Sequence, residues 1–323
     1  MWIEKERCPY FSVEDTTPWH GDVFDHPSYD YFCSKNGTKK QVYGTYCYRC
    51  EVLKNMTVKE RLMEHLTEAR QYFAEKQIVG ILLQGSQNYG LDLPDSDVDT
   101  KLIVVPSFKD ICLNRKPVST THVRANNEHI DWKDIRLYME TFRKQNLNFL
   151  EILFTDYYWI NPMYEDQWMR LVQKREQIAR MNPWRAVKSM KGIAMEKYHA
   201  MEHEYPSKVD VLAKWGYDPK QLYHLLRVEE YLGRYINGEK YEDCLRPHCS
   251  EYLMNVKKGQ YDLNTARVIG KIAIENVIRV ADAFCSQTSD KEDEAMRGLL
   301  EDVSYRIMKI SVENELKEGD YSD

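Results

Sequence analysis

The sequence predicts an α/β (α+β) core with a mixed sheet, an all-helical C-terminal domain and a small loop-rich N-terminal arm. Two apolar runs, Ile78–Leu83 and Leu102–Val105, have the Ile, Leu and Val composition of buried strands. From Asn161 onward the pattern is helical, whereas the first 55 residues carry little periodic apolar pattern. We therefore expect three parts, at residues 1–55, 56–160 and 161–323.

Composition narrows the class of protein. A chain of 323 residues can bury a sizeable core in one large or two modest domains. Its net charge of −6 argues against general coating of nucleic acid, although local basic surfaces remain possible. The chain has no apolar run of about 18 residues and its N-terminus lacks an apolar signal core. We expect a cytoplasmic protein without membrane association.

The N-terminal arm contains the zinc-knuckle-like feature of the sequence. Cys47 and Cys50 have the C-x-x-C spacing at which two thiolates reach one tetrahedral Zn²⁺, and Cys8 and Cys33 would complete four ligands. A short segment without a visible core needs such a cross-link to fold. The alternative is that Cys8 and Cys33 are ordinary small apolar residues beside a coincidental C-x-x-C pair.

The next elements lead into and out of the core. Thr57–Glu60 has the form of a capping box, so we expect a helix to begin there and to continue through Phe73. After the second predicted strand, Thr121–Ala125 and Glu128–Lys133 are typical of a hairpin.

The segment between the two predicted strands carries the chemistry. Asp97 and Asp99 lie on one face of the chain together with Lys101, because side chains alternate along a strand. Two such carboxylates suit a divalent metal better than a core. Gly85 permits a sharp turn, and Ser86 offers a hydroxyl and an amide to a phosphate. With Gly90 and Ser96 the pattern is G-S-x₃-G-x₅-S-D-x-D, which is far more specific than either half.

This pattern resembles the signature of the DNA polymerase β-like nucleotidyltransferase superfamily, which includes tRNA nucleotidyltransferases, small antitoxin nucleotidyltransferases and antibiotic adenylyltransferases. Two further segments, Asp134–Phe154 and Gly216–Arg227, are similar to bacterial and phage predicted nucleotidyltransferases associated with RNA repair. The resemblance extends roughly from Val79 to Gly238. It implies a nucleotidyltransferase core that uses two Mg²⁺ ions, or Mn²⁺, and a nucleoside triphosphate such as ATP.

The resemblance also implies a third catalytic carboxylate on a neighbouring strand. We favour Asp131, since Ile130 and Trp132 would face the core and leave it on the metal side. Asp134 is the rival, although its place before a helical pattern suits an N-cap. Glu151 stands in an apolar run, and its role is open. It either orients a basic or metal-bound group or pairs with an arginine on a helix face.

The helical half contributes a polar stripe. Asp218-Pro219 is typical of a helix start. Lys220, Tyr223, His224 and Arg227 then follow at one-turn spacing without an acid among them, which suits contact with a triphosphate or RNA phosphates. A plain solvated face is the alternative. Farther on, Asp262–Phe284 predicts a core helix, and the acidic stretch after Ser289 predicts a solvated final helix.

These observations predict a Mg²⁺-dependent nucleotidyltransferase that moves a nucleoside monophosphate onto a hydroxyl, with an RNA or tRNA end as the first acceptor to consider. In that mechanism Asp97, Asp99 and Asp131 hold the metal ions, and Gly85 and Ser86 hold the β- and γ-phosphates. A non-catalytic nucleotide-sensing or RNA-binding module is an alternative. A third hypothesis is an antitoxin-like enzyme that modifies a partner protein.

Overall fold

The computed structural model describes residues 11–15, 29–34, 37–41, 51–93, 96–124, 128–205 and 208–319. The chain divides into two compact units, Met1–Glu64 and His65–Asp323. The predicted boundaries at residues 55 and 160 stay predictions.

The first unit contains a small antiparallel sheet where the sequence predicted only loops. Its strands are β1 (Phe11–Asp15), β2 (Tyr29–Cys33) and β3 (Lys40–Gln41), in the order β1-β2-β3. These strands have five residues or fewer, and an alternation as short as Phe11–Glu14 is a weak signal of a strand in a sequence. Of the four cysteines proposed for zinc, Cys33 ends β2 and is half-buried, whereas Cys8, Cys47 and Cys50 lie outside the described residues.

Helix α2 (Glu51–Ala69) connects the two units in sequence. It begins well before Thr57, so the predicted capping box is wrong as a helix start and lies within the helix. It ends at Ala69, and the predicted stripe therefore extends beyond it at Phe73.

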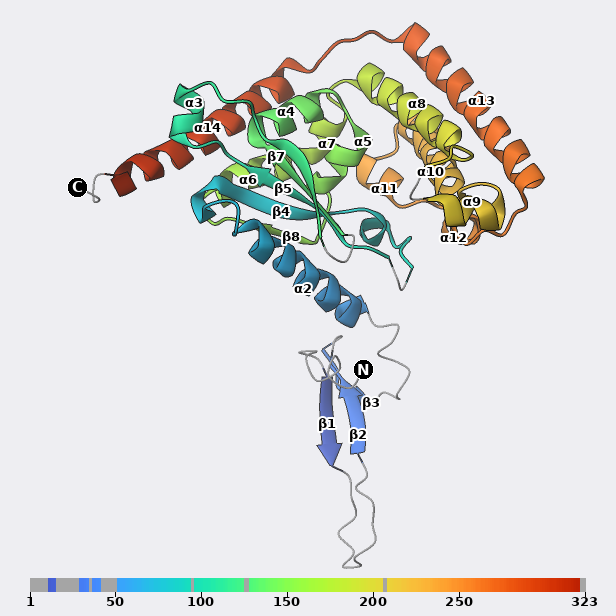
Figure 1. Cartoon of the computed structure of the whole chain (residues 1–323), viewed down its shortest axis with the longest axis horizontal. Helices are drawn as coiled ribbons and strands as arrows, with labels where there is room; N and C mark the ends of the chain where they lie inside the picture. The colour runs from blue at the N-terminus through green and yellow to red at the C-terminus, as the bar shows by residue number, and fades with distance from the viewer. Residues whose placement is uncertain are drawn as a thin grey trace, which may run out of the picture. The chain divides into compact units, whose positions relative to one another are not determined.

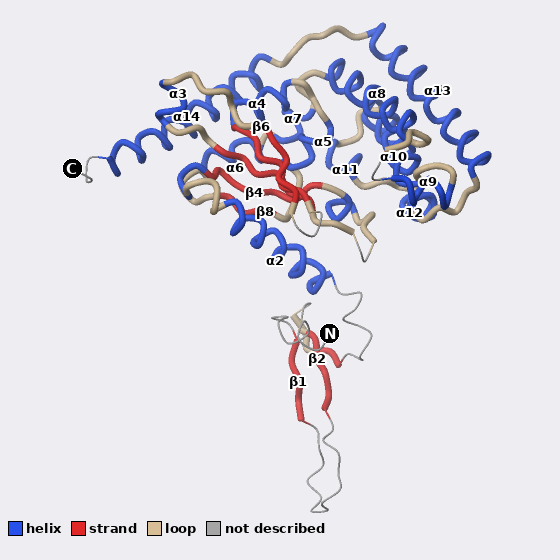
Figure 2. Tube along the Cα trace, in the orientation of Figure 1, coloured by secondary structure: helices blue, strands red, loops and turns tan. Residues whose placement is uncertain are grey.

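A five-stranded mixed sheet forms the centre of the second unit (Figures 1 and 2). The spatial order is β6-β7-β5-β4-β8; β5 and β7 are parallel and the other neighbours are antiparallel. Both predicted strands and the predicted hairpin are confirmed. The bounds are β4 (Ile78–Gln84), β5 (Asp99–Val104), β6 (Ser119–Val123), β7 (His129–Asp134) and β8 (Tyr158–Ile160).

The two faces of this sheet are covered differently. On one face, the last turns of α2 contact it through His65 and Glu68. On the other face, Tyr138 and Phe142 of α4 (Ile135–Arg143) belong to the same apolar core as Ile103 of β5. Short elements complete this part of the unit: η2 (Glu75–Gln77), η3 (Ser86–Tyr89), α3 (Phe108–Cys112), α5 (Leu147–Leu150), η4 (Glu151–Leu153), α6 (Glu165–Gln173) and α7 (Arg175–Ala179).

The remainder is helical, as predicted, and three long helices pack on one another (Figure 1). These are α8 (Pro183–Ala200), α10 (Pro219–Ile236) and α13 (Leu263–Gln287), and α10 begins at the predicted N-cap Asp218. The shorter helices are α9 (Val209–Trp215), α11 (Tyr241–Leu245) and α12 (Ser250–Lys257). None of the helices in the described ranges is long and apolar enough to cross a membrane.

The last helix corrects one expectation. Helix α14 (Glu294–Gly319) was predicted to be solvated, but Leu300, Val303 and Ile307 are buried. It packs against α4 and α6, so the chain returns to the sheet layer after the helical layer (Figure 1). Its many acidic residues lie outside this buried stripe, and they make the composition of the segment resemble that of a fully solvated helix.

Candidate active site

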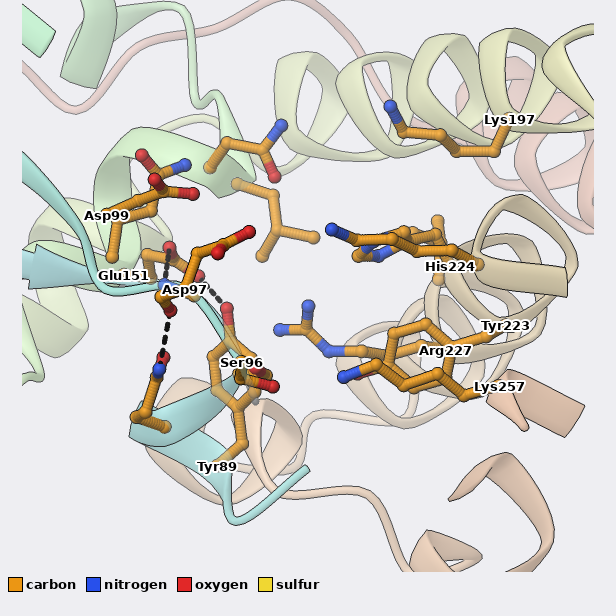
Figure 3. A pocket seen from close by; sticks show the side chains of 18 of the residues that line it. Tyr89, Ser96, Asp97, Asp99, Glu151, Lys197, Tyr223, His224, Arg227 and Lys257 are labelled. Atoms are coloured by element: carbon orange, nitrogen blue, oxygen red, sulfur yellow. Dashed lines mark hydrogen bonds between the residues drawn. The ribbon is translucent and has the colours of Figure 1, made fainter. Parts of the chain in front are cut away.

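A pocket of about 410 Å³ lies in the second unit, between the ends of β4 and β5 and the helices α8, α10 and α12 (Figure 3). Nine of the predicted site residues line it, namely Gly85, Ser86, Ser96, Asp97, Asp99, Lys220, Tyr223, His224 and Arg227. Gly90, Lys101 and Asp131 are not part of the lining. Its size falls within the usual range for small-ligand sites.

The glycine–serine turn begins at the end of β4. Gly85 has φ 106° and ψ −161°, a conformation that is essentially restricted to glycine. The turn continues as η3 and ends at Gly90, whose φ of 69° is left-handed and whose N–H donates to the carbonyl of Ser86. Gly90 therefore shapes the turn, while Gly85 and Ser86 line the pocket.

Glu151, whose role the sequence left open, is hydrogen-bonded to this turn. Its carboxylate is buried; Oε2 accepts the hydroxyl of Tyr89 at 2.5 Å and Oε1 accepts the N–H of Gly85 at 3.3 Å. Burial raises the pKa of Glu151, and the charge of Arg227 and the hydrogen bond from Tyr89 oppose this rise. No arginine forms an ion pair with it among the described residues, and both of its hydrogen bonds connect it to the turn.

The paired carboxylates stand at the beginning of β5. Asp97 precedes the strand and is exposed, and Asp99 is its first residue with a side chain that is 42% exposed. The Oδ1 atom of Asp99 accepts the backbone N–H of His129 at 3.0 Å and lies 3.1 Å from Nδ1 of the same residue. The Nε2 atom of Gln87 donates to the carbonyl of Asp97 at 2.6 Å. Both carboxylates keep oxygens available at the pocket.

Ser96 supports the same segment. Its hydroxyl accepts the N–H of Leu93 at 2.7 Å, and its own N–H donates to the carbonyl of Leu93 at 3.0 Å. Both residues line the pocket. Ser96 therefore stabilises the turn that precedes Asp97.

Asp131 stands deeper along the sheet than Asp99. The parallel register of β5 and β7 places it opposite Lys101, whose Nζ lies 2.5 Å from its Oδ2, and Thr121 donates to its Oδ1 at 2.5 Å. Although burial raises the pKa of Asp131, Lys101 and Thr121 together lower it. Asp134, the rival, is the N-cap of α4 and accepts the N–H of Arg136, as its place in the sequence indicated.

The opposite wall of the pocket is cationic. The stripe of α10 faces the pocket, and Lys197 of α8 and Lys257 of α12 extend it (Figure 3). Sequence reasoning missed these two lysines, because nothing local distinguishes them from other surface lysines. The ammonium of Lys257 donates to the carbonyl of Leu91 at 2.8 Å and so connects α12 to the loop after η3.

Arg227 is the most unusual member of this wall. Its side chain is 8% exposed, and the guanidinium carbon lies 3.7 Å from the ring centroid of Tyr89. Its Nε and Nη2 atoms are buried and donate to no acceptor among the described residues. Burial and the neighbouring cations Arg227 and Lys220 lower the pKa of His224 well below its usual value, so this imidazole is neutral near pH 7. Buried polar atoms of this kind are usually hydrogen-bonded, so these two donors of Arg227 are available to a group that enters the pocket.

The carboxylate pair fits a magnesium ion. Mg²⁺ commonly binds proteins through one or two carboxylates and completes its octahedral coordination with water and substrate phosphates. No cluster of three or more His, Cys, Asp or Glu side chains arranged for a metal occurs among the described residues. Asp97 and Asp99 therefore match the kind of site in which the substrate supplies the remaining ligands.

No protein-family model and no curated protein matches the chain. Among solved structures, it is similar to a nucleotidyltransferase-like protein from Exiguobacterium sibiricum 255-15, with 8% identity over 69% of this chain and 74% of that one. The TM-score is 0.27. At this level the likeness carries no argument, and the functional interpretation depends on the pocket itself.

Proposed function

We propose that the protein is a Mg²⁺-dependent nucleotidyltransferase that moves a nucleoside monophosphate from a nucleoside triphosphate to a hydroxyl group. The observation that carries this proposal is the arrangement of opposite charges around one pocket. Arg227 and Lys257 reach into it from the helical side, and Asp97 points into it from the sheet side (Figure 3). A triphosphate with a bound cation is the ligand class that matches both walls.

The cationic wall and the glycine–serine turn bind the phosphates in this proposal. Arg227 has two unused buried donors, which suit the planar, bidentate recognition of a phosphate. Lys197 and Lys220 add charge without a fixed geometry. The backbone at Gly85 and Ser86 can approach a phosphate closely, because Gly85 carries no Cβ.

The carboxylates would hold the metal ion. When bound between Asp97 and Asp99, Mg²⁺ supplies charge stabilisation at the reacting phosphate and lowers the pKa of the attacking hydroxyl. The acceptor oxygen bonds to the α-phosphorus, the bond to the bridging oxygen breaks, and pyrophosphate leaves with its charge compensated by the cationic wall. Asp131 remains our proposal for a third carboxylate, and binding there requires it to exchange Lys101 for the metal.

The acceptor proposed for the first test is an RNA 3′-hydroxyl. This choice follows from the resemblance of Asp134–Phe154 and Gly216–Arg227 to the nucleotidyltransferases associated with RNA repair, and not from the pocket. Transfer to a side-chain hydroxyl of a partner protein is the competing outcome.

Label transfer tests the proposal. Each of the four α-³²P-labelled nucleoside triphosphates is incubated with the protein, Mg²⁺, total RNA and cell protein, and pyrophosphate release is measured in parallel. The Asp97→Asn/Asp99→Asn variant should lose both signals. Asp156→Asn is the matched control, because Asp156 is exposed and lies outside the pocket lining.

The outcomes separate the hypotheses. Label in RNA that the double variant loses supports an RNA acceptor, and label in protein supports modification of a partner. Binding of a nucleoside triphosphate without pyrophosphate release from any of the four would refute the transferase and favour a nucleotide-sensing module. Equal activity in the double variant and the wild type would refute the assignment of these carboxylates.

A further inference from the structure

A buried polar cluster lies on the other face of the sheet, behind the carboxylate pair. It consists of His65 from α2, Thr100 from β5, and Arg124 and Glu128 from the β6–β7 hairpin. Because side chains alternate along β5, Thr100 points away from the face that carries Asp99. The cluster therefore contacts the segment Asp97–Thr100 from behind the pocket.

Glu128 is the centre of the cluster. It is 1% exposed, and its Oε1 atom accepts the backbone N–H of Val98 at 3.1 Å. Its Oε2 atom accepts Nη1 of Arg124 at 2.8 Å and lies 3.0 Å from Nε2 of His65. The carboxylate thus connects the backbone between the two metal-site aspartates to a buried imidazole.

His65 carries the connection to the strand. It is fully buried, and its Nδ1 atom lies 2.8 Å from the hydroxyl oxygen of Thr100. Each ring nitrogen therefore has one hydrogen-bond partner, Thr100 at Nδ1 and Glu128 at Nε2. Both contacts depend on the ring keeping one orientation.

Consecutive residues are therefore anchored by different groups. Glu128 holds the amide of Val98, His129 holds the carboxylate of Asp99, and His65 holds the hydroxyl of Thr100. We propose that His65 and Glu128 are positioning residues that set the direction in which Asp97 and Asp99 present their carboxylates to a metal ion. This inference rests on the proposed function, because it assigns the metal to that carboxylate pair.

The surroundings favour positioning over simple stabilisation. Leu66, Leu102 and Ile130 are fully buried apolar residues of the same three elements, so this part of the protein already has an apolar core. Placing an imidazole and a carboxylate there incurs a desolvation cost that well-packed apolar residues avoid. Their directional hydrogen bonds to one short segment offer what an apolar residue cannot, namely a fixed backbone geometry. Groups that orient metal ligands act in this way in other metal sites.

Glu68 provides a matched control within the same network. Its Oε2 atom accepts Nε of Arg124 at 2.7 Å and its Oε1 atom lies 2.6 Å from Nε2 of His122. It is a carboxylate of the same chemistry at the outer end of the network, and no hydrogen bond joins it to Val98 or Thr100 in the described structure.

The test uses the full chain with Glu128→Leu, Thr100→Val and Glu68→Gln. Thr100→Val is nearly isosteric and removes only the hydroxyl that His65 contacts, so it keeps the test valid if Glu128→Leu fails to fold. The first readout is the dissociation constant of Mn²⁺ in the presence of a non-hydrolysable nucleoside triphosphate, from the electron paramagnetic resonance signal of free Mn²⁺. The second is hydrogen exchange at the amide of Val98. The third is the affinity for the nucleotide without metal.

Glu128→Leu and Thr100→Val should weaken Mn²⁺ binding by about 10- to 100-fold, the usual effect of removing a group that orients a metal ligand. Glu128→Leu should also accelerate exchange at Val98. In Glu68→Gln, both the Mn²⁺ dissociation constant and the exchange rate at the amide of Val98 should stay within about twofold of the wild type. Affinity for the metal-free nucleotide should be unchanged in all three variants, because that binding depends on the cationic wall. Restoring part of the Mn²⁺ affinity with Glu128→Gln, which keeps one acceptor oxygen, would further support positioning.

Two results would overturn the inference. One is unchanged Mn²⁺ affinity in the folded variants, even if their melting temperature falls, because a purely structural role would have that effect. The other is unchanged exchange at Val98 in Glu128→Leu. If the wild type binds no Mn²⁺ with the nucleotide, the proposed function fails, and the exchange measurement still shows independently whether Glu128 anchors the segment.

Discussion

Replacing Arg227 by methionine should make the folded protein more stable and its nucleotide site weaker. The side chain is 8% exposed, and methionine follows a similar path without charge. The Nε and Nη2 atoms have no acceptor among the described residues, and each buried donor without a partner costs roughly 1–3 kcal/mol. Removing both relieves about 2–6 kcal/mol of unfavourable free energy.

Two losses oppose this gain. The contact of the guanidinium with the Tyr89 ring, at 3.7 Å, contributes about 0.5–2 kcal/mol. The positive charge of Arg227 also favours the ionised form of Glu151, and its loss costs about 2 kcal/mol at an effective dielectric constant near 20. The expected net effect is a gain of about 1 kcal/mol, or about 1–2 °C in melting temperature for a chain of 323 residues.

The nucleotide affinity should change in the opposite direction. A hydrogen bond from a charged group contributes about 1.5–3 kcal/mol, so losing the arginine should raise the Kd for a magnesium nucleoside triphosphate roughly 10- to 150-fold. Urea unfolding and isothermal titration measure the two effects on the same preparations. Arg175→Met is the matched control, because Arg175 pairs with Glu242 outside the pocket lining and should affect stability by less than about 1 kcal/mol. A variant that unfolds at least about 2 kcal/mol more easily and binds the nucleotide like the wild type would refute the reasoning.

Three further predictions concern the turn and the buried charges. Gly85→Ala should lower the free energy of unfolding by about 1–3 kcal/mol, because Gly85 has a φ of 106°. Gly90→Ala should lower it by only about 1–2 kcal/mol, because Gly90 has a left-handed φ of 69°. Equal losses in urea unfolding would contradict this ranking. Asp131→Asn should cost about 3 kcal/mol at pH 7, because the 2% exposed Lys101 loses its partner. Since the folded-state pKa of Asp131 is lowered, this cost should be present above about pH 3.8 and shrink as the pH falls through the lowered pKa; a loss that is constant with pH would argue against it. Burial raises the pKa of Glu151, so its ionisation disfavours folding as the pH rises above the ordinary value of 4.5. The stability of Glu151→Gln relative to the wild type should therefore improve over that range. A stability difference that does not change with pH would contradict a raised pKa of Glu151.

Local patterns in the sequence were sufficient for much of the fold. The two apolar runs became β4 and β5, and the hairpin became β6 and β7. The Asp218-Pro219 start of α10 also stands in the structure. Each of these features depends on residues close together in the chain, where strand alternation, helix caps and turn preferences act directly.

Some features of the fold were beyond local patterns. The strands of the small sheet β1-β2-β3 have five residues or fewer, too short for a clear period, and α14 buries an apolar face that its acidic composition conceals. In both cases the composition of the segment was a poor guide, because what decides a strand or a buried helix face is the partner that it packs against.

Some features of the candidate site could likewise be predicted from the sequence, whereas others could not. The spacing from Gly85 to Asp99 was enough to predict a turn beside paired carboxylates, because its meaning lies in one continuous segment. The stripe on α10 could likewise be predicted to share one helix face, since residues one turn apart are neighbours.

The contacts between distant segments were decided only by the tertiary structure. The register of β5 and β7 pairs Asp131 with Lys101, and the packing of α8, α10 and α12 brings Lys197 and Lys257 to the pocket. The same packing buries Arg227 over Tyr89. The sequence specifies which chemical groups a protein has, and local backbone geometry sets the relative orientation of side chains within a few residues of one another. Which distant groups meet, and how deeply each is buried, depends on the free energy of packing the whole chain.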